Sequence, residues 1–125
     1  MDPSASRIAN GPLAPHGAAL VLVGDDRAAL QAVLLLQEFG MAVDVAEDEG
    51  AALIWARRAS YQLIVCGGGP RHEVLALRLV RAAPKARIAY LSREAAPRGF
   101  PAIGIHTLSL PLDVNAFVEV ARAQI

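Results

Sequence analysis

Lysine, cysteine and aromatic residues are scarce in this chain of 125 residues. The single cysteine, Cys66, has no internal disulfide partner, which fits a reducing compartment. Lysine and arginine total 12, as do aspartate and glutamate, so the balanced charge gives no electrostatic basis for a nucleic-acid or membrane-surface partner. No stretch approaches the roughly 18 consecutive apolar residues of a membrane span. We therefore expect a cytoplasmic protein with neither a nucleic-acid nor a membrane partner.

Apolar residues are abundant by contrast. Hydrophobic residues make up 54% of the chain and charged residues 19%, which predicts one globular domain with a substantial core. Residues 1–17 are rich in Pro, Ser, Gly and Asn and lack the basic and then apolar layout of a signal peptide. We expect a flexible leader over 1–17 and a folded domain over 18–125.

From residue 18 onward, short apolar runs alternate with segments of helical periodicity, which predicts a parallel sheet with helices on both faces. The predicted fold is a three-layer, doubly wound α/β domain whose five strands follow the flavodoxin-like order 2-1-3-4-5. Pro97, Gly99 and Pro101 predict a short or irregular fourth helix, because each interrupts a regular helix. The predicted strands are 18–23, 41–47, 62–66, 86–92 and 105–109, and the predicted helices are 27–39, 49–59, 71–83 and 114–124.

Two features follow strands that this topology makes neighbours. Asp25 and Asp26 follow the first strand, and the glycine triplet 67–69 follows the third. Since the carboxyl ends of parallel strands meet at one edge of a sheet, we expect both features to meet at the switch point. Either aspartate also suits the cap position of the first helix.

Five motifs in sequence order resemble the receiver domain of two-component response regulators, and the resemblance covers 18–125. They are "VLVGDD", "FGMAVDVAEDEGAAL", "YQLIVCGGGP", "AYLS" and "LSLPLDVNAF". In that family an acidic pair holds Mg²⁺ and an aspartate at the end of the third strand accepts a phosphoryl group. A hydroxyl residue and a lysine then respond to the new charge. Asp25 and Asp26 match the acidic pair, and Ser92 matches the hydroxyl residue.

The rest of the family's set is missing. Counting along the third strand places Gly67 at the acceptor position, and counting back from Pro70 places Cys66 there, so neither count yields a carboxylate. Leu110 stands at the lysine position and Thr107 where the family often has an aromatic switch residue. Leucine cannot donate a hydrogen bond to a phosphoryl oxygen.

The resemblance therefore implies a pseudo-receiver: a non-enzymatic signalling module that interacts with proteins independently of phosphorylation. We expect no catalytic residue, no cofactor, and a protein partner such as a histidine kinase, another signalling protein or a second copy of the chain. The alternative is a domain that binds a small molecule or an anion with the loop 67–69 and the Asp25/Asp26 region.

Several residues allow both a functional and a structural interpretation. Asp25 and Asp26 would hold a metal only weakly, because Mg²⁺ normally recruits further oxygen ligands. Cys66 is either a redox-sensitive thiol or a buried, inert one. His72 and His106 have no partner at a metal-ligand spacing and are expected to be solvated or locally hydrogen-bonded.

Large apolar side chains at positions expected to face water predict a partner surface. Such residues occur in the predicted helices 27–39, 49–59 and 114–124. The candidates are Leu35, Ile54, Trp55, Phe117 and Val120.

Overall fold

The computed structural model describes residues 17–122. The five strands are β1 (Ala18–Val23), β2 (Ala42–Val45), β3 (Leu63–Gly67), β4 (Arg87–Ser92) and β5 (Ile105–Ser109). The four α-helices are α1 (Asp26–Glu38), α2 (Glu49–Arg58), α3 (His72–Ala82) and α4 (Val114–Arg122), and a 3₁₀ turn, η2, covers Pro101–Ile103.

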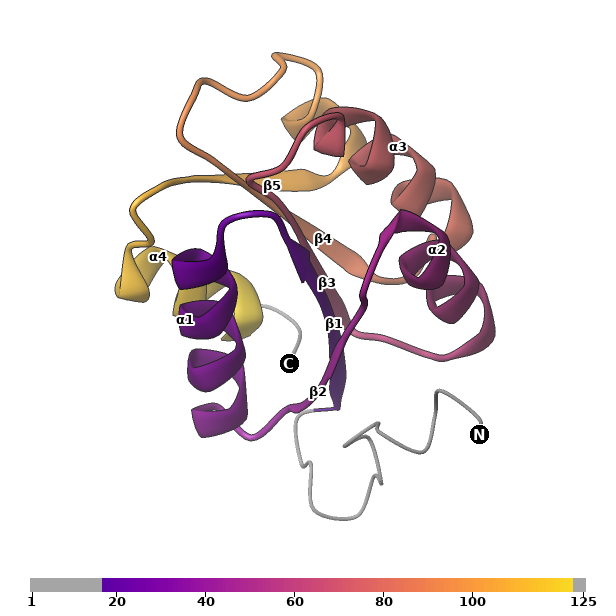
Figure 1. Cartoon of the computed structure of the whole chain (residues 1–125), viewed down its shortest axis with the longest axis horizontal. Helices are drawn as coiled ribbons and strands as arrows, with labels where there is room; N and C mark the ends of the chain where they lie inside the picture. Colours follow the sequence, from indigo (N-terminus) through magenta and orange to yellow (C-terminus); the bar gives the residue numbers. More distant parts are fainter. Residues whose placement is uncertain (1–16, 123–125) are drawn as a thin grey trace.

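All four strand pairs are parallel, and the sheet has the order β2-β1-β3-β4-β5. Helices α1 and α4 cover one face of the sheet, and α2 and α3 cover the other (Figure 1). The predicted three-layer, doubly wound fold is confirmed. This topology places the carboxyl ends of β1, β3 and β4 side by side.

Two apolar clusters stabilise the layers, one on each face of the sheet. In β3, Leu63 and Val65 pack toward α1 and α4, whereas Ile64 and Cys66 pack toward α2 and α3. The alternation follows from the two-residue period of a strand. Because all five residues of β3 are buried, this strand is the centre of the core.

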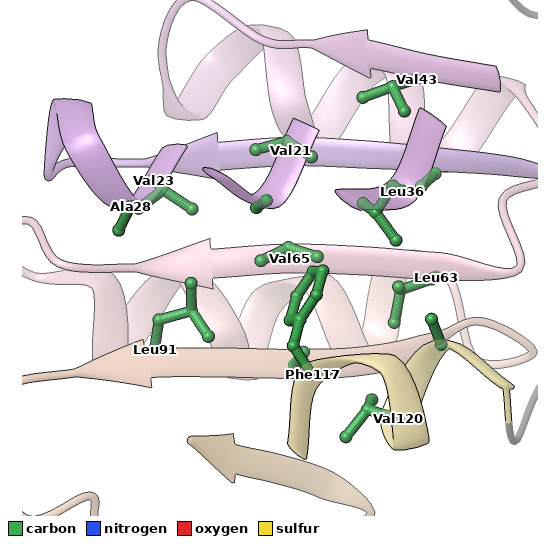
Figure 2. Close-up of a cluster of buried hydrophobic side chains, with 14 of the residues drawn as sticks. Val21, Val23, Ala28, Leu36, Val43, Leu63, Val65, Leu91, Phe117 and Val120 are labelled. Atoms are coloured by element: carbon green, nitrogen blue, oxygen red, sulfur yellow. The ribbon is translucent and has the colours of Figure 1, made fainter. Parts of the chain in front are cut away.

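Two of the expected interface residues belong to this core. Phe117 is 1% exposed and Val120 is 9% exposed. Figure 2 shows the Phe117 ring reaching from α4 toward Val65 of β3. The prediction that Phe117 forms a partner surface is wrong, because the apolar face of α4 packs on its own sheet. Val120 belongs to the same core and offers a partner only its small exposed fraction.

The connection between β4 and β5 has no α-helix, in agreement with the expectation of a short or irregular fourth helix. Its regular structure is the single turn η2, which begins at Pro101. Phe100 compensates for the missing helix because its ring packs edge-on against Tyr90, with the ring centroids 5.1 Å apart. This contact covers the α2/α3 face of the sheet near β4.

The boundaries predicted near the two ends of the chain can be compared with the structure only in part. The expected leader, 1–17, lies outside the described residues except for Gly17, and the expected end of the last helix at 124 lies outside them as well. Strand β3 extends one residue further than predicted, to Gly67. No helix in the described range 17–122 has the length and apolar character that crossing a membrane requires.

Candidate functional site at the carboxyl ends of the strands

A cavity of about 430 Å³ lies where β1, β3 and β4 end. The loop 68–70 forms part of its wall, and the other lining residues include Asp25, Ser92 and Leu110. The sheet topology predicted this meeting place. What the cavity can do depends on which side chains enter it.

Asp25 enters the cavity and Asp26 does not. The Asp25 side chain caps α1, because its Oδ1 accepts a hydrogen bond of 3.0 Å from the Ala28 N–H. Asp26 is the first residue of α1 and is exposed outside the cavity lining. The expectation that both carboxylates meet the glycine loop is therefore wrong, since the helix begins between them.

Arg93 supplies a cation to the remaining carboxylate. Its guanidinium Nη2 donates to Asp25 Oδ2 at 2.6 Å, which joins the end of β1 to the residue that follows β4. The Ala28 N–H, together with this guanidinium, lowers the pKa of Asp25 below its usual value. Among residues 17–122, no three His, Cys, Asp or Glu side chains gather in a way that would hold a metal ion.

Gly67 cannot carry a side chain in this fold. Its φ is +119°, and a Cβ built on it would lie 2.0 Å from the Leu91 carbonyl oxygen. Backbone of the neighbouring strand β4 therefore occupies the position where the first carbon of an aspartate would stand. An acceptor carboxylate at this residue would require β3 and β4 to move apart.

Cys66 points away from the cavity. It is fully buried in the cluster beneath α2 and α3, and burial raises the pKa of its thiol to about 12. The nucleophilic thiolate is therefore nearly absent at neutral pH. The geometry fits the inert interpretation of Cys66 and gives no support to redox sensing.

The glycine loop packs directly against the end of β1. A Cβ on Gly24 would lie 2.6 Å from the Gly69 Cα, and the Gly24 N–H donates to the Gly67 carbonyl at 2.8 Å. The Gly67 N–H donates in turn to Nδ1 of the buried His72 at 3.0 Å. Glycine is required at Gly24 because the backbone of the loop 67–69 passes too close to leave room for a side chain. His72 is locally hydrogen-bonded.

Of the three positions that the resemblance links to switching, Ser92 and Leu110 are neighbours: the Leu110 N–H donates to the Ser92 carbonyl at 2.9 Å, and both residues line the cavity. The Ser92 Oγ accepts from the Glu94 N–H at 3.1 Å, and Leu110 is buried in the core cluster beneath α1 and α4 while it lines the cavity. Thr107 lies exposed on β5 and does not line the cavity.

Gly24 and Arg93 are residues at the site whose part sequence reasoning did not identify. Gly24 precedes the acidic pair, and Arg93 directly follows Ser92, so their positions were available as signals. Their contacts were not, because Arg93 and Asp25 are 68 residues apart in the chain.

The outer surface of α1 and α2 also differs in part from the expectation. Leu35 and Trp55 are partly buried and pack against the core clusters, whereas Ile54 is 46% exposed. On α1 the exposed leucines are Leu30 and Leu34, at 60% and 52%. They are one helical turn apart, so they form a small apolar patch.

Solved structures similar to this chain include receiver domains. The receiver domain of the hybrid histidine kinase CckA matches with a TM-score of 0.67 and 23% identity over 86% of this chain and 98% of that one. The chemotaxis response regulator CheY4 of Vibrio cholerae matches with a TM-score of 0.70 and 19% identity over 87% and 98%.

A CheY-like receiver domain from Methylobacillus flagellatus matches with a TM-score of 0.73 and 18% identity over 87% of this chain and 98% of that one. The chain has the receiver-domain fold. No protein-family model and no curated protein sequence matches it. At these identities the likeness shows the fold alone.

Proposed function

We propose that the chain is a pseudo-receiver, a non-enzymatic signalling module that binds proteins without being phosphorylated. The observation that carries the proposal is the steric closure of the acceptor position. A Cβ at Gly67 would lie 2.0 Å from the Leu91 carbonyl oxygen, and the Cys66 side chain faces the opposite side of the sheet. Aspartyl phosphorylation needs a carboxylate at the end of β3, and neither residue can be one without rearrangement.

The charges of the cavity support the same proposal. Phosphoryl transfer to a carboxylate needs cationic groups that hold the transferred oxygens. Leu110 provides an apolar side chain at the lysine position, and the Arg93 guanidinium is paired with Asp25. The contact between Arg93 and Asp25 connects β1 to the β4–β5 connection in the unphosphorylated chain.

Exposed apolar side chains on α1 and α2 are the surfaces that we assign to a protein partner, such as a histidine kinase or another signalling protein. Leu30 and Leu34 lie on α1, and Ile54 lies on α2. They replace Leu35 and Trp55 as the residues offered to a partner, because those two side chains contribute to the core.

The alternative of an anion or small-molecule site has less support. The Gly67 N–H already donates to His72, so it is not available to an anion, and Asp26 lies outside the cavity. The acidic Asp25, Glu73 and Glu94 line the cavity beside Arg71 and Arg93. Such mixed charge does not favour an anion.

Acetyl phosphate with Mg²⁺, followed by intact-mass spectrometry, tests the absence of phosphorylation. We expect no phosphoryl adduct on the full chain. A mass increase of one phosphoryl group that hydroxylamine removes, which marks an acyl phosphate, would refute the proposal.

Pull-down from the native cytosol tests the partner surface, with Leu34→Glu and Ile54→Glu as the disrupting variants. Gln31→Glu is the matched control for α1, because it introduces a carboxylate at an exposed polar position of the same helix. We expect the control to keep a partner that at least one apolar-to-acidic variant loses. If both variants fold and retain every partner, the assigned surface is wrong.

A further inference from the structure

Strand β5 lies at one edge of the sheet, so some of its backbone groups face outward. The Leu110 N–H donates to the Ser92 carbonyl of β4, and the Ile105 N–H donates to the Phe100 carbonyl of the preceding loop. Because a strand directs the backbone groups of alternate residues to opposite sides, His106 and Leu108 bond to β4, whereas Thr107 and Ser109 direct theirs outward. Within residues 17–122, neither Thr107 nor Ser109 has a backbone partner on that outer side.

Strand β5 lacks the usual protection of a sheet edge. Edge strands normally carry a charged side chain, a proline or a bulge, or a helix covers them. The sequence of β5, "IHTLS", has no charged residue and no proline. The connection between β4 and β5 has no α-helix that could cover this edge, and its regular structure is the turn η2 (Figure 1). The opposite edge strand, β2, is shorter and largely buried.

A groove follows this open edge. It has a volume of about 410 Å³ and includes His106, Thr107 and Leu108 of the strand itself. Pro101 of η2 forms one side and Val120 of α4 forms another part of the wall. An extended chain is the ligand that fits such a place, because it uses the backbone groups of the edge and places alternate side chains in the groove.

We propose that β5 pairs antiparallel with β5 of a second copy, about a two-fold axis at Thr107. Each Thr107 N–H then donates to the carbonyl of the partner's Thr107. The Ser109 N–H donates to the carbonyl of the partner's Ile105, and the symmetric bond forms in return. The ladder ends there because the Ile105 N–H is already bonded to Phe100. The two sheets become one continuous sheet through four backbone hydrogen bonds.

The side chains of β5 favour its own copy as the occupant. In this register Thr107 lies opposite the partner's Thr107, a favourable cross-strand pair, and His106 lies opposite the partner's Leu108. No charged side chain lies opposite another, since β5 has none. The Arg87 Nη1 contacts His106 Nε2 at 2.7 Å, so the polar end of that ring is satisfied within its own molecule. A two-fold dimer also closes on itself and leaves neither β5 edge open.

Sedimentation equilibrium of the full chain up to millimolar concentration tests the pairing with Thr107→Pro. Proline removes the donor of two of the four intermolecular bonds, yet it spares the β4–β5 ladder, to which the Thr107 N–H does not contribute. We expect a dimer of the unmodified chain and a dimer dissociation constant at least about tenfold higher for Thr107→Pro. Thr107→Val, which keeps the N–H and the branched shape, is the matched control and should remain dimeric.

A charge exchange tests the two-fold axis itself. Thr107→Lys and Thr107→Glu should each be monomeric, because like charges meet at the axis, and a mixture of the two should form a heterodimer. Circular dichroism checks that each variant is folded. A monomeric unmodified chain, an undiminished dimer of Thr107→Pro, or a mixture that stays monomeric would each overturn the inference. The inference would also be overturned if the chain were monomeric and its β5 edge bound only extended peptides whose sequence differs from that of β5.

The dimer does not depend on the absence of phosphorylation. A phosphoryl adduct would refute the pseudo-receiver proposal and leave the β5 pairing standing, and a monomeric chain would do the reverse. The two experiments therefore fail separately.

Discussion

Gly67 stands where the third strand meets the cavity, and two separate features restrict it. Its φ of +119° favours glycine, and a Cβ on it would meet the Leu91 carbonyl oxygen at 2.0 Å. Gly104 shares only the first feature, since its φ is +86° with open space around it, and Gly99 has neither. Comparing substitutions at the three glycines therefore distinguishes the effect of the blocked Cβ position from the effect of backbone strain.

We predict graded losses of stability for alanine at these positions. Gly99→Ala should change the free energy of unfolding by less than ~0.5 kcal/mol, and Gly104→Ala should lower it by about 1 kcal/mol. Gly67→Ala should lower it by about 3 kcal/mol or more, because strain and displacement of β4 add. Urea denaturation measures all three. Equal losses at Gly67 and Gly104 would show that the Leu91 carbonyl does not close the acceptor position.

Helix α4 shows what an amphipathic pattern leaves open. Phe117 and Val120 share an apolar stripe, which suits either the core of the chain or the surface of a partner. In the structure the stripe packs on the α1 side of the sheet, and Val114 at the start of the helix is 49% exposed. Helices α1 and α2 also carry exposed apolar residues, which are Leu30 and Leu34 on α1 and Ile54 on α2.

For α4 we predict that Phe117→Ala lowers the free energy of unfolding by about 3–5 kcal/mol, through lost burial and the cavity left behind. Val114→Ala, in the same helix, should change it by less than ~1 kcal/mol, because the side chain is half exposed. Thermal and urea denaturation of both variants give the comparison. If Phe117→Ala changes the free energy of unfolding only slightly, α4 would again be a candidate partner surface.

His106 and Asp25 both have lowered pKa values, so each makes the stability of the whole molecule depend on pH, in different ranges. Burial and the nearby Arg87 lower the pKa of His106 from its ordinary value of 6.5, so the unfolded chain takes up that proton first. Its contribution to stability is complete above 6.5 and is lost as the pH falls toward the lower folded pKa. The pKa of Asp25 is lowered from 3.8, so its contribution is complete above 3.8 and is lost as the pH falls through the folded pKa.

We therefore predict two separate declines in the urea midpoint on acidification, one beginning near pH 6.5 and one beginning near pH 3.8. His106→Gln should remove the first decline, and Asp25→Asn should remove the second while lowering stability at neutral pH. Asp26→Asn is the control for Asp25→Asn, because Asp26 neither caps α1 nor contacts Arg93. A first decline that persists in His106→Gln would assign it to another group.

Much of the fold follows from local patterns that the sequence displays. Five apolar runs and their helical connections predicted the strand order, and Ile105–Ser109 has the bounds that the pattern indicated. Pro97, Gly99 and Pro101 predicted the loss of a regular fourth helix, because their restrictions are local to the backbone. The boundaries of α1, α2 and α3 differ from the prediction by at most one residue, and at the start of α1 the cap residue Asp25 decides the boundary.

The sequence by itself determined which groups are missing near the carboxyl ends of the strands: position 110 is leucine where the family has lysine, and neither Cys66 nor Gly67 carries a carboxylate. Only the tertiary structure decided that Arg93 neutralises Asp25, that β4 closes the position beside Gly67, and that Phe117 belongs to the core. The reason is physical. Residue types and periodicity are properties of neighbouring positions in the chain, whereas ion pairs, steric closure and burial depend on segments that only folding brings together.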